Sequence, residues 1–298
     1  MKDEIVIAQA FSKEIRIHAA RMTGTVEQAR IAHHCMPSSA AALGRTMTAA
    51  AIMASDLKNE DEKIVAVING HGPAGTILVQ AKGNGDVRGF ISDPSVYYAR
   101  EDGHLDVART VGTDGTLTVI RDMGLKDTFS GVVKLQSGEI GEDFTYYFTV
   151  SEQTPSAVSV GVLVDPDGSV IAAGGLIIQL MPNASEEAVT LCEKAVASLR
   201  PATDLISEGY SPEEIIRMYF PDAEILGSRD VRWHCGCSRE HYRKALSVLQ
   251  DADLEEMIED GKGAEITCQF CGNTYFFNTE DLKEILENKR AEDRQSLS

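Results

Sequence analysis

The sequence lacks the features that would place the chain in or across a membrane. No uninterrupted apolar run among its 298 residues reaches the roughly 20 residues that a transmembrane helix needs. Its first four residues, Met-Lys-Asp-Glu, lack the apolar segment of a signal peptide. We therefore expect a cytoplasmic protein with no membrane partner. In that reducing compartment, clustered cysteines favour metal binding or redox sensing over structural disulfides.

The chain is also short of basic residues. It has 28 Lys and Arg against 46 Asp and Glu, and its formal net charge is −18 at pH 7. A charge of this sign repels phosphate backbones and anionic lipid, so we expect no nucleic-acid partner. An RNA-binding zinc module, which normally carries the opposite sign, is disfavoured for the same reason.

The first part of the chain predicts a mixed fold. Residues 40–57 form an Ala- and Met-rich helix with few charges, which predicts burial on most of its sides. β-branched or alternating runs predict strands at residues 5–11, 14–20, 64–69, 76–82, 87–92, 117–121 and 129–136, and a hairpin of residues 157–164 and 169–180. This pattern predicts an α+β protein in which residues 1–182 form an N-terminal α/β core domain with a central sheet and packed helices.

The chain changes character after Pro182. Residues 185–199 have the apolar spacing of a helix, and Ser211 and Glu214 form a capping box with proline at the first helical position. No strand pattern occurs among these helices. Residues 183–234 are therefore predicted to be a mostly helical linker.

Residues 235–298 hold four of the six cysteines. Cys235 and Cys237 form a CxC pair, and Cys268 and Cys271 form a CxxC pair. Four thiolates from two short segments are the ligand set of a closed tetrahedral zinc site. A module this small needs a cross-link such as a bound metal, because its hydrophobic core cannot stabilise it alone. We predict a C-terminal module with one Zn²⁺, in which neither His234 nor His241 is needed as a ligand.

The close spacing within each pair also suggests redox chemistry. Neighbouring sulfurs of a tetrahedral site with Zn–S bonds of about 2.3 Å lie roughly 3.7 Å apart, and a disulfide needs about 2.05 Å. Once the metal leaves, each sulfur is a short movement from its sequence neighbour, which predicts the disulfides Cys235–Cys237 and Cys268–Cys271. A disulfide across one intervening residue is strained, and strained disulfides are the reducible, regulatory ones.

Three other motifs suggest chemistry that we do not expect. Residues 70–75 match GxGxxG, but Pro73 and a predicted strand follow where a dinucleotide site requires a helix. The run His33-His34-Cys35 is expected to be a helix end packed on the core, since no general base is evident near it. Cys192 lies in an apolar helical stripe and is expected in the core.

Several further runs can be compared with known families. Together with the CxC and CxxC pairs, they extend over nearly the whole chain. They are Ala42-Leu43-Gly44-Arg45, Gly70-His71-Gly72-Pro73-Ala74-Gly75, Val87-Arg88-Gly89-Phe90, Ser137-Gly138-Glu139-Ile140, Tyr146-Tyr147-Phe148, Ser151-Glu152-Gln153-Thr154-Pro155-Ser156-Ala157-Val158 and Ala172-Ala173-Gly174-Gly175. This set resembles the 33 kDa chaperonin, or heat-shock protein 33, family of redox-regulated holdase chaperones. His241 departs from the arginine that is more usual there.

The resemblance implies an ATP-independent chaperone without a catalytic centre. Its reduced, zinc-bound form would be inactive. Oxidants acting with unfolding conditions would form the two neighbouring disulfides and release zinc. The module and linker would then unfold, exposing apolar surface that holds unfolding client proteins and favours a homodimer. The alternative is a cytoplasmic α/β enzyme with a purely structural zinc site, which has no acid/base or nucleophile constellation that the sequence supports.

Overall fold

The computed structural model describes residues 2–125 and 128–296. The chain divides into two compact units, Met1–His234 and Cys235–Ser298. Both units combine helices with β-strands, which confirms the predicted α+β class. No helix within the described ranges is both long enough and apolar enough to cross a membrane.

Five strands form the first sheet of the larger unit. Their order is β10-β1-β2-β9-β8, and every neighbouring pair is antiparallel. β8 and β9 form the predicted hairpin. The strands are β1 (Glu4–Ala10), β2 (Ile15–Arg21), β8 (Ser156–Val164), β9 (Val170–Leu180) and β10 (Glu224–Asp230).

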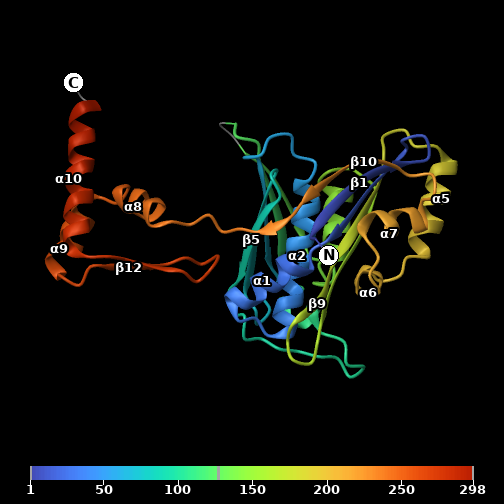
Figure 1. The fold of residues 1–298 in the computed structure, drawn as a ribbon, viewed down its shortest axis with the longest axis horizontal. Coiled ribbons are helices and arrows are strands. Elements are labelled where there is room, and N and C mark those ends of the chain that lie inside the picture. Colours follow the sequence, from blue (N-terminus) through green and yellow to red (C-terminus); the bar gives the residue numbers. More distant parts are fainter. Residues whose placement is uncertain (1, 126–127, 297–298) are drawn as a thin grey trace. The chain divides into compact units, whose positions relative to one another are not determined.

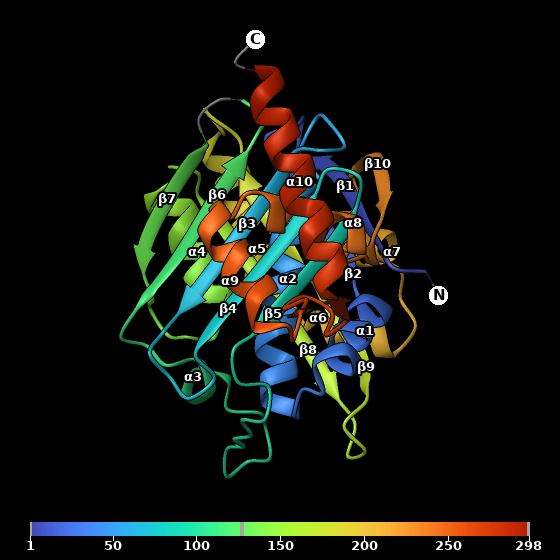
Figure 2. The same cartoon turned by 90° about the vertical axis from the view of Figure 1, so that its left-hand side faces the viewer.

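Six strands form the second sheet, in the order β11-β5-β4-β3-β6-β7. Figure 2 shows β5, β4, β3, β6 and β7 of this sheet. β3 and β4 alternate buried and half-buried residues, so one face of this sheet lines the core. We predicted one central sheet; the strands separate into two because alternation identifies the faces of a strand and not its neighbours. The strands are β3 (Lys63–Asn69), β4 (Thr76–Lys82), β5 (Asp86–Ile91), β6 (Thr116–Asp122), β7 (Phe129–Lys134) and β11 (Arg232–Trp233).

Helix α2 (Pro37–Ala54) lies at the centre of the larger unit, beside α1 (Thr23–His33) in Figure 1. It packs against β3, β4 and β5 of one sheet and against β8 and β9 of the other. Every residue of α2 is buried except Pro37 and Arg45, which confirms its predicted burial. Its many alanines favour the helix and leave room for a sheet on each side. The shorter helices α3 (Val107–Val111) and α4 (Gly141–Val150) follow later in this unit.

Three helices cover the opposite face of the first sheet: α5 (Glu186–Ala197), α6 (Ala202–Ser207) and α7 (Pro212–Tyr219). α6 contacts β9, and α7 contacts β1 and β2. The predicted capping box opens α7. Beneath these helices lies an apolar cluster that is separate from the core around α2, and it includes Ile15, Ile17, Leu205, Ile216 and Phe220.

The region predicted to be a mostly helical linker also contains a strand, β10, that the sequence analysis did not predict. β10 pairs along β1, from Glu4 opposite Asp230 to Gln9 opposite Glu224. None of the seven side chains of β10 is buried, and they show no buried–exposed alternation. β10 is held through its backbone, and its partner β1 lies at the other end of the unit's sequence. A side-chain pattern therefore could not indicate this strand.

The smaller unit combines one hairpin with three helices. Its elements are α8 (Arg239–Ser247), α9 (Asp251–Asp260), β12 (Ala264–Thr267), β13 (Thr274–Phe277) and α10 (Thr279–Ser296). Its core cluster is small. Among the described residues that cluster has seven buried side chains, which are Leu246, Leu254, Ala264, Phe277, Leu282, Ile285 and Leu286.

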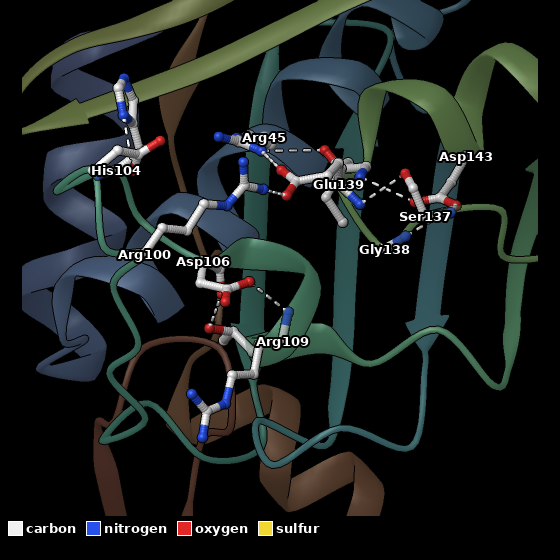
Figure 3. A network of polar contacts seen from close by, with 12 residues as sticks. Arg45, Arg100, His104, Asp106, Arg109, Ser137, Gly138, Glu139 and Asp143 are labelled. Atoms are coloured by element: carbon white, nitrogen blue, oxygen red, sulfur yellow. Dashed lines mark hydrogen bonds and ion pairs between the residues drawn. The ribbon is translucent and has the colours of Figure 1, made fainter.

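A polar network ties the loop before α4 to α2 (Figure 3). Arg45 Nη1 donates to Glu139 Oε2 over 2.7 Å, and Arg100 pairs with the other oxygen of the same carboxylate. Arg45 is the charged residue in an otherwise uncharged helix, and Glu139 neutralises it. Two of the sequence runs used for the family comparison therefore meet in this network.

The buried carboxylate of Asp143 organises the same loop. Its side chain is fully buried and accepts four backbone N–H groups, from Gln136 (2.7 Å), Ser137 (3.1 Å), Gly138 (3.4 Å) and Ile140 (2.9 Å). These bonds hold Ile140 at a φ of 71°, a left-handed conformation that β-branched residues rarely adopt. The carboxylate therefore stabilises backbone that would otherwise be both strained and unsatisfied.

Asp143→Asn should destabilise the larger unit by about 2–4 kcal/mol, because the charged acceptor is lost and an amide N–H can face the N–H of Ile140. Asp167→Asn is a matched control, since its carboxylate accepts from Ser169 in an exposed turn. The control should change stability by no more than about 0.5 kcal/mol. Urea unfolding of the reduced protein, followed by far-UV circular dichroism, measures both. Equal losses would contradict the role assigned to Asp143.

Candidate metal centre

The two cysteine pairs occupy two turns of the smaller unit. Cys235 and Cys237 precede α8, whose first turn is capped by the hydroxyl of Ser238, which accepts the His241 N–H over 3.1 Å. Cys268 and Cys271 lie in the turn between β12 and β13. The helix cap and the hairpin thus present the two pairs as short, locally ordered segments.

The four sulfur atoms lie together. Cys235 Sγ is 3.5 Å from Cys268 Sγ, and Cys237 Sγ is 3.3 Å from Cys271 Sγ. All four sulfurs lie within 4.8 Å of one another, and each cysteine is a free thiol. A tetrahedral zinc–thiolate site with bonds of about 2.3 Å has sulfurs roughly 3.7 Å apart. The cluster therefore has the size and donor set that zinc requires.

Backbone N–H groups offset part of the cost of ionising three of these sulfurs. Gly236 and Gly272 have φ angles of 66° and 71°, so each turn passes through a conformation that favours glycine. The Gly272 N–H donates to the Cys268 carbonyl over 2.8 Å, which closes the second turn. In addition, the N–H groups of Cys237, Phe270 and Asn273 donate to the sulfurs of Cys235, Cys268 and Cys271, respectively. Amide donors of this kind favour the charged form of sulfur.

Two tyrosine hydroxyls extend this hydrogen bonding. The Tyr275 hydroxyl donates to Cys237 Sγ over 3.1 Å, and the Tyr242 hydroxyl donates to Cys268 Sγ. The two rings lie 5.1 Å apart between centroids. Each cysteine pair thus receives one hydroxyl. Sequence reasoning missed both donors, because Tyr242 falls in the apolar stripe of its helix and Tyr275 in a strand, where aromatic residues are ordinary.

The thiols differ in acidity. Burial raises the pKa of Cys235 and of Cys271. Burial also opposes ionisation of Cys268, but hydrogen bonds from the Tyr242 hydroxyl and the Phe270 N–H outweigh it and lower the pKa to about 7. The bond to Cys237, followed by burial, raises the pKa of Tyr275 to about 12, so this hydroxyl remains a donor. Four thiolates this close repel one another, and a bound cation would relieve that repulsion.

The remaining motifs lie where the sequence placed them. His234 and His241 are exposed and are not part of the sulfur cluster. Cys192 is buried in the apolar cluster beneath α5. Cys35 is buried just after α1, and burial raises its pKa to about 12, which makes it a poor nucleophile. Residues 70–75 connect antiparallel β3 and β4, so no helix follows them.

The fold and the site define a two-unit α+β protein whose smaller unit carries a four-cysteine cluster that could hold a metal ion. Comparison with known proteins agrees with this description. A family model described as Hsp33 protein matches residues 3–278. The chain therefore belongs to the Hsp33 family, as its sequence resemblance indicated.

Individual relatives match over almost their whole length. The 33 kDa chaperonin of Staphylococcus carnosus is 46% identical over 299 residues, which cover 97% of this chain and 99% of that protein. The 33 kDa chaperonin of Staphylococcus aureus is 44% identical over 289 residues, covering 96% and 98%. The crystal structure of the 33 kDa chaperonin, a heat shock protein 33 homolog, from Thermotoga maritima matches with a TM-score of 0.87. That pair is 35% identical, and the match covers 98% of this chain and 100% of that one.

Tyr275→Phe should weaken zinc binding by about tenfold, because it removes a donor to a ligand sulfur and keeps the ring. Tyr242→Phe should act in the same direction through Cys268. Competition with a chromogenic chelator under reducing conditions measures both effects. Tyr210→Phe, an exposed tyrosine of the larger unit, is the control and should leave zinc affinity unchanged. Unaltered affinity in both site variants would show that the hydroxyls do not support the metal centre.

Proposed function

We propose that this chain is a redox-regulated, ATP-independent holdase. Its family and the name of its relatives support a chaperone. Reduced and zinc-bound, it is inactive; oxidative stress activates it to keep unfolding proteins from aggregating in the cytoplasm. The observation that carries the proposal is the clustering of four thiol sulfurs within 4.8 Å in a unit with a very small core.

Cys235, Cys237, Cys268 and Cys271 are the proposed zinc ligands. Zn²⁺ bound there would supply a cross-link between the two turns, worth on the order of 10–16 kcal/mol of folding free energy. Seven buried side chains contribute far less once conformational entropy is subtracted. The fold of residues 235–298 is therefore proposed to depend on these four thiolates and their metal.

Oxidation is proposed to convert the ligands into the disulfides Cys235–Cys237 and Cys268–Cys271. For each pair, two thiolates, one hydrogen peroxide and two protons give one disulfide and two waters. The shortest sulfur contacts in the folded cluster run between the pairs, at 3.5 and 3.3 Å. Chain connectivity instead supports pairing of sequence neighbours, since only neighbours stay close after the module loosens. A sulfur in a disulfide is no longer a thiolate, so zinc is released.

The proposed division of labour follows the chain. Residues 1–182 are the core for client binding and dimerisation, 183–234 the redox-sensitive linker, and 235–298 the switch. The linker helices α5, α6 and α7 cover an apolar face of the first sheet. Their unfolding would expose that face to client proteins and to a second copy, while the charge of −18 maintains solubility.

Peroxide at raised temperature tests this proposal. Treated protein should release one zinc per chain and suppress light scattering by a thermally unfolding client, and added dithiothreitol should reverse both effects. ATP should have no influence. Equal suppression by the reduced, zinc-loaded protein would contradict redox control.

Cys271→Ser should uncouple activity from peroxide. The variant lacks one ligand, so it should bind zinc weakly and hold clients even when reduced. Cys35→Ala is the matched control, because that thiol is buried outside the cluster. It should retain the full peroxide dependence of client holding. A Cys271→Ser variant that still needs peroxide would contradict the role of this cysteine, with chelator competition confirming its zinc content.

A further inference from the structure

Residues 224–233 connect the edges of both large sheets. β10 forms the edge of the five-stranded sheet by pairing with β1, and β11 forms the edge of the six-stranded sheet by pairing with β5. Figure 1 shows this stretch running from β1 towards β5. Without it, the backbone groups of β1 and β5 would face solvent unpaired, which is the condition that attracts another extended chain.

The stretch is held mostly through its backbone. β10 makes six residue pairs with β1 although none of its side chains is buried. Further along, the N–H of Val231 donates to the Asp3 carbonyl (3.2 Å). The N–H groups of Arg232 and His234 donate to the carbonyls of Gly85 (3.1 Å) and Val87 (3.0 Å). Contacts of this kind do not depend on the side chains of the bound strand.

Three side chains supply apolar contacts. Half-buried Ile225 packs against the apolar cluster beneath α5, α6 and α7, and two others reach the core around α2. Val231 is buried in the core around α2, and Trp233 packs against the same core, with its ring edge-to-face with His33 at 5.9 Å. Residues two apart in an extended strand point to the same side. The edges therefore accept an extended backbone with apolar side chains at alternate positions.

The residue between Val231 and Trp233 meets a carboxylate. Arg232 Nε donates to Asp86 Oδ1 over 2.6 Å, and Asp86 is buried while Arg232 is largely exposed. If Arg232 left, this carboxylate would lose its ion pair. A basic residue at the middle position of an incoming strand would restore it.

We propose that the β1 and β5 edges, vacated by residues 224–233 when the linker unfolds, bind unfolding client proteins by strand addition. The occupant is an extended client segment of the form apolar–basic–apolar, whose backbone replaces that of β10 and β11. This inference rests on the proposed holdase function and names its client-binding surface. Backbone recognition suits an unfolded client because every polypeptide offers the same N–H and carbonyl groups.

The test uses the full-length oxidised protein and a labelled peptide with the sequence of residues 224–233. Before peptide is added, the amides of β1 and β5 that face β10 and β11 in the reduced protein should exchange freely with solvent, while those that face β2 and β4 stay protected. The fluorescence of Trp233, the single tryptophan, should report solvent exposure. The peptide should then protect the exchanging β1 and β5 amides. A reduced, carboxymethylated client protein should displace it, and the reduced chaperone should not bind it.

Three matched peptides separate the contributions that the backbone, the arginine and the other side chains make to peptide binding. N-methylation of alternate backbone nitrogens should abolish binding. Replacing the middle arginine, Arg232→Ala, should weaken it about tenfold, the loss expected for one charge-assisted hydrogen bond. A peptide in which Ile225 and residues 231–233 are kept and the other residues of 224–230 are scrambled should bind as well as the native one, because those other residues are held through their backbone.

Several outcomes would overturn the proposal. One is equal binding of the N-methylated peptide, and another is client holding by an oxidised protein whose β1 and β5 edge amides stay unprotected. Protection of both edges in an oxidised dimer before peptide is added would assign them to a second copy. The proposed function fails separately, if the oxidised protein does not suppress client aggregation at all.

Discussion

Four sulfur atoms lie within 4.8 Å of one another in the smaller unit, and we propose that the fold of this unit depends on them. Its core has too few buried side chains to offset the entropy of ordering the unit, and burial makes free thiolates costly at this spacing. Backbone amides and two tyrosine hydroxyls lower that cost without removing it. A cation is the remaining requirement, and the donor set fits zinc. The same atoms that provide the cross-link are oxidisable, so the stability of the unit and its redox chemistry cannot be separated.

The larger unit has an extensive hydrophobic core of its own. α2 is buried between two sheets, and its one charged residue, Arg45, is neutralised by Glu139. A second apolar cluster lies on the far face of the first sheet, beneath α5, α6 and α7. Nothing in this arrangement requires a metal. If the smaller unit depends on a metal as proposed, it can unfold while the larger unit keeps its structure, which is the behaviour that a switch requires.

The sequence predicted those parts of the structure that depend on the type and spacing of side chains. CxC and CxxC spacing predicted the cluster, and the Ala-rich run with few charges predicted a helix buried on most sides. It did not predict the parts that depend on backbone hydrogen bonds or on a partner far away in the sequence. The side chains of β10, Glu-Ile-Leu-Gly-Ser-Arg-Asp, do not alternate between apolar and polar, and its partner β1 lies at the other end of the unit's sequence. The hydroxyl donors Tyr242 and Tyr275 could not be distinguished from ordinary core aromatics, because hydrogen bonding to sulfur leaves no sequence pattern.

Removal of zinc without oxidation tests the central claim most directly. The reduced protein is treated with a strong chelator under anaerobic conditions, and its amide hydrogen exchange is compared with that of the zinc-loaded form. We predict that protection in α8, β12, β13 and α10 disappears while that in α2, β3 and β4 persists, and that returning zinc restores it. Retained protection throughout residues 235–286 in the metal-free, reduced protein would contradict the claim that four thiolates and their metal hold this unit together.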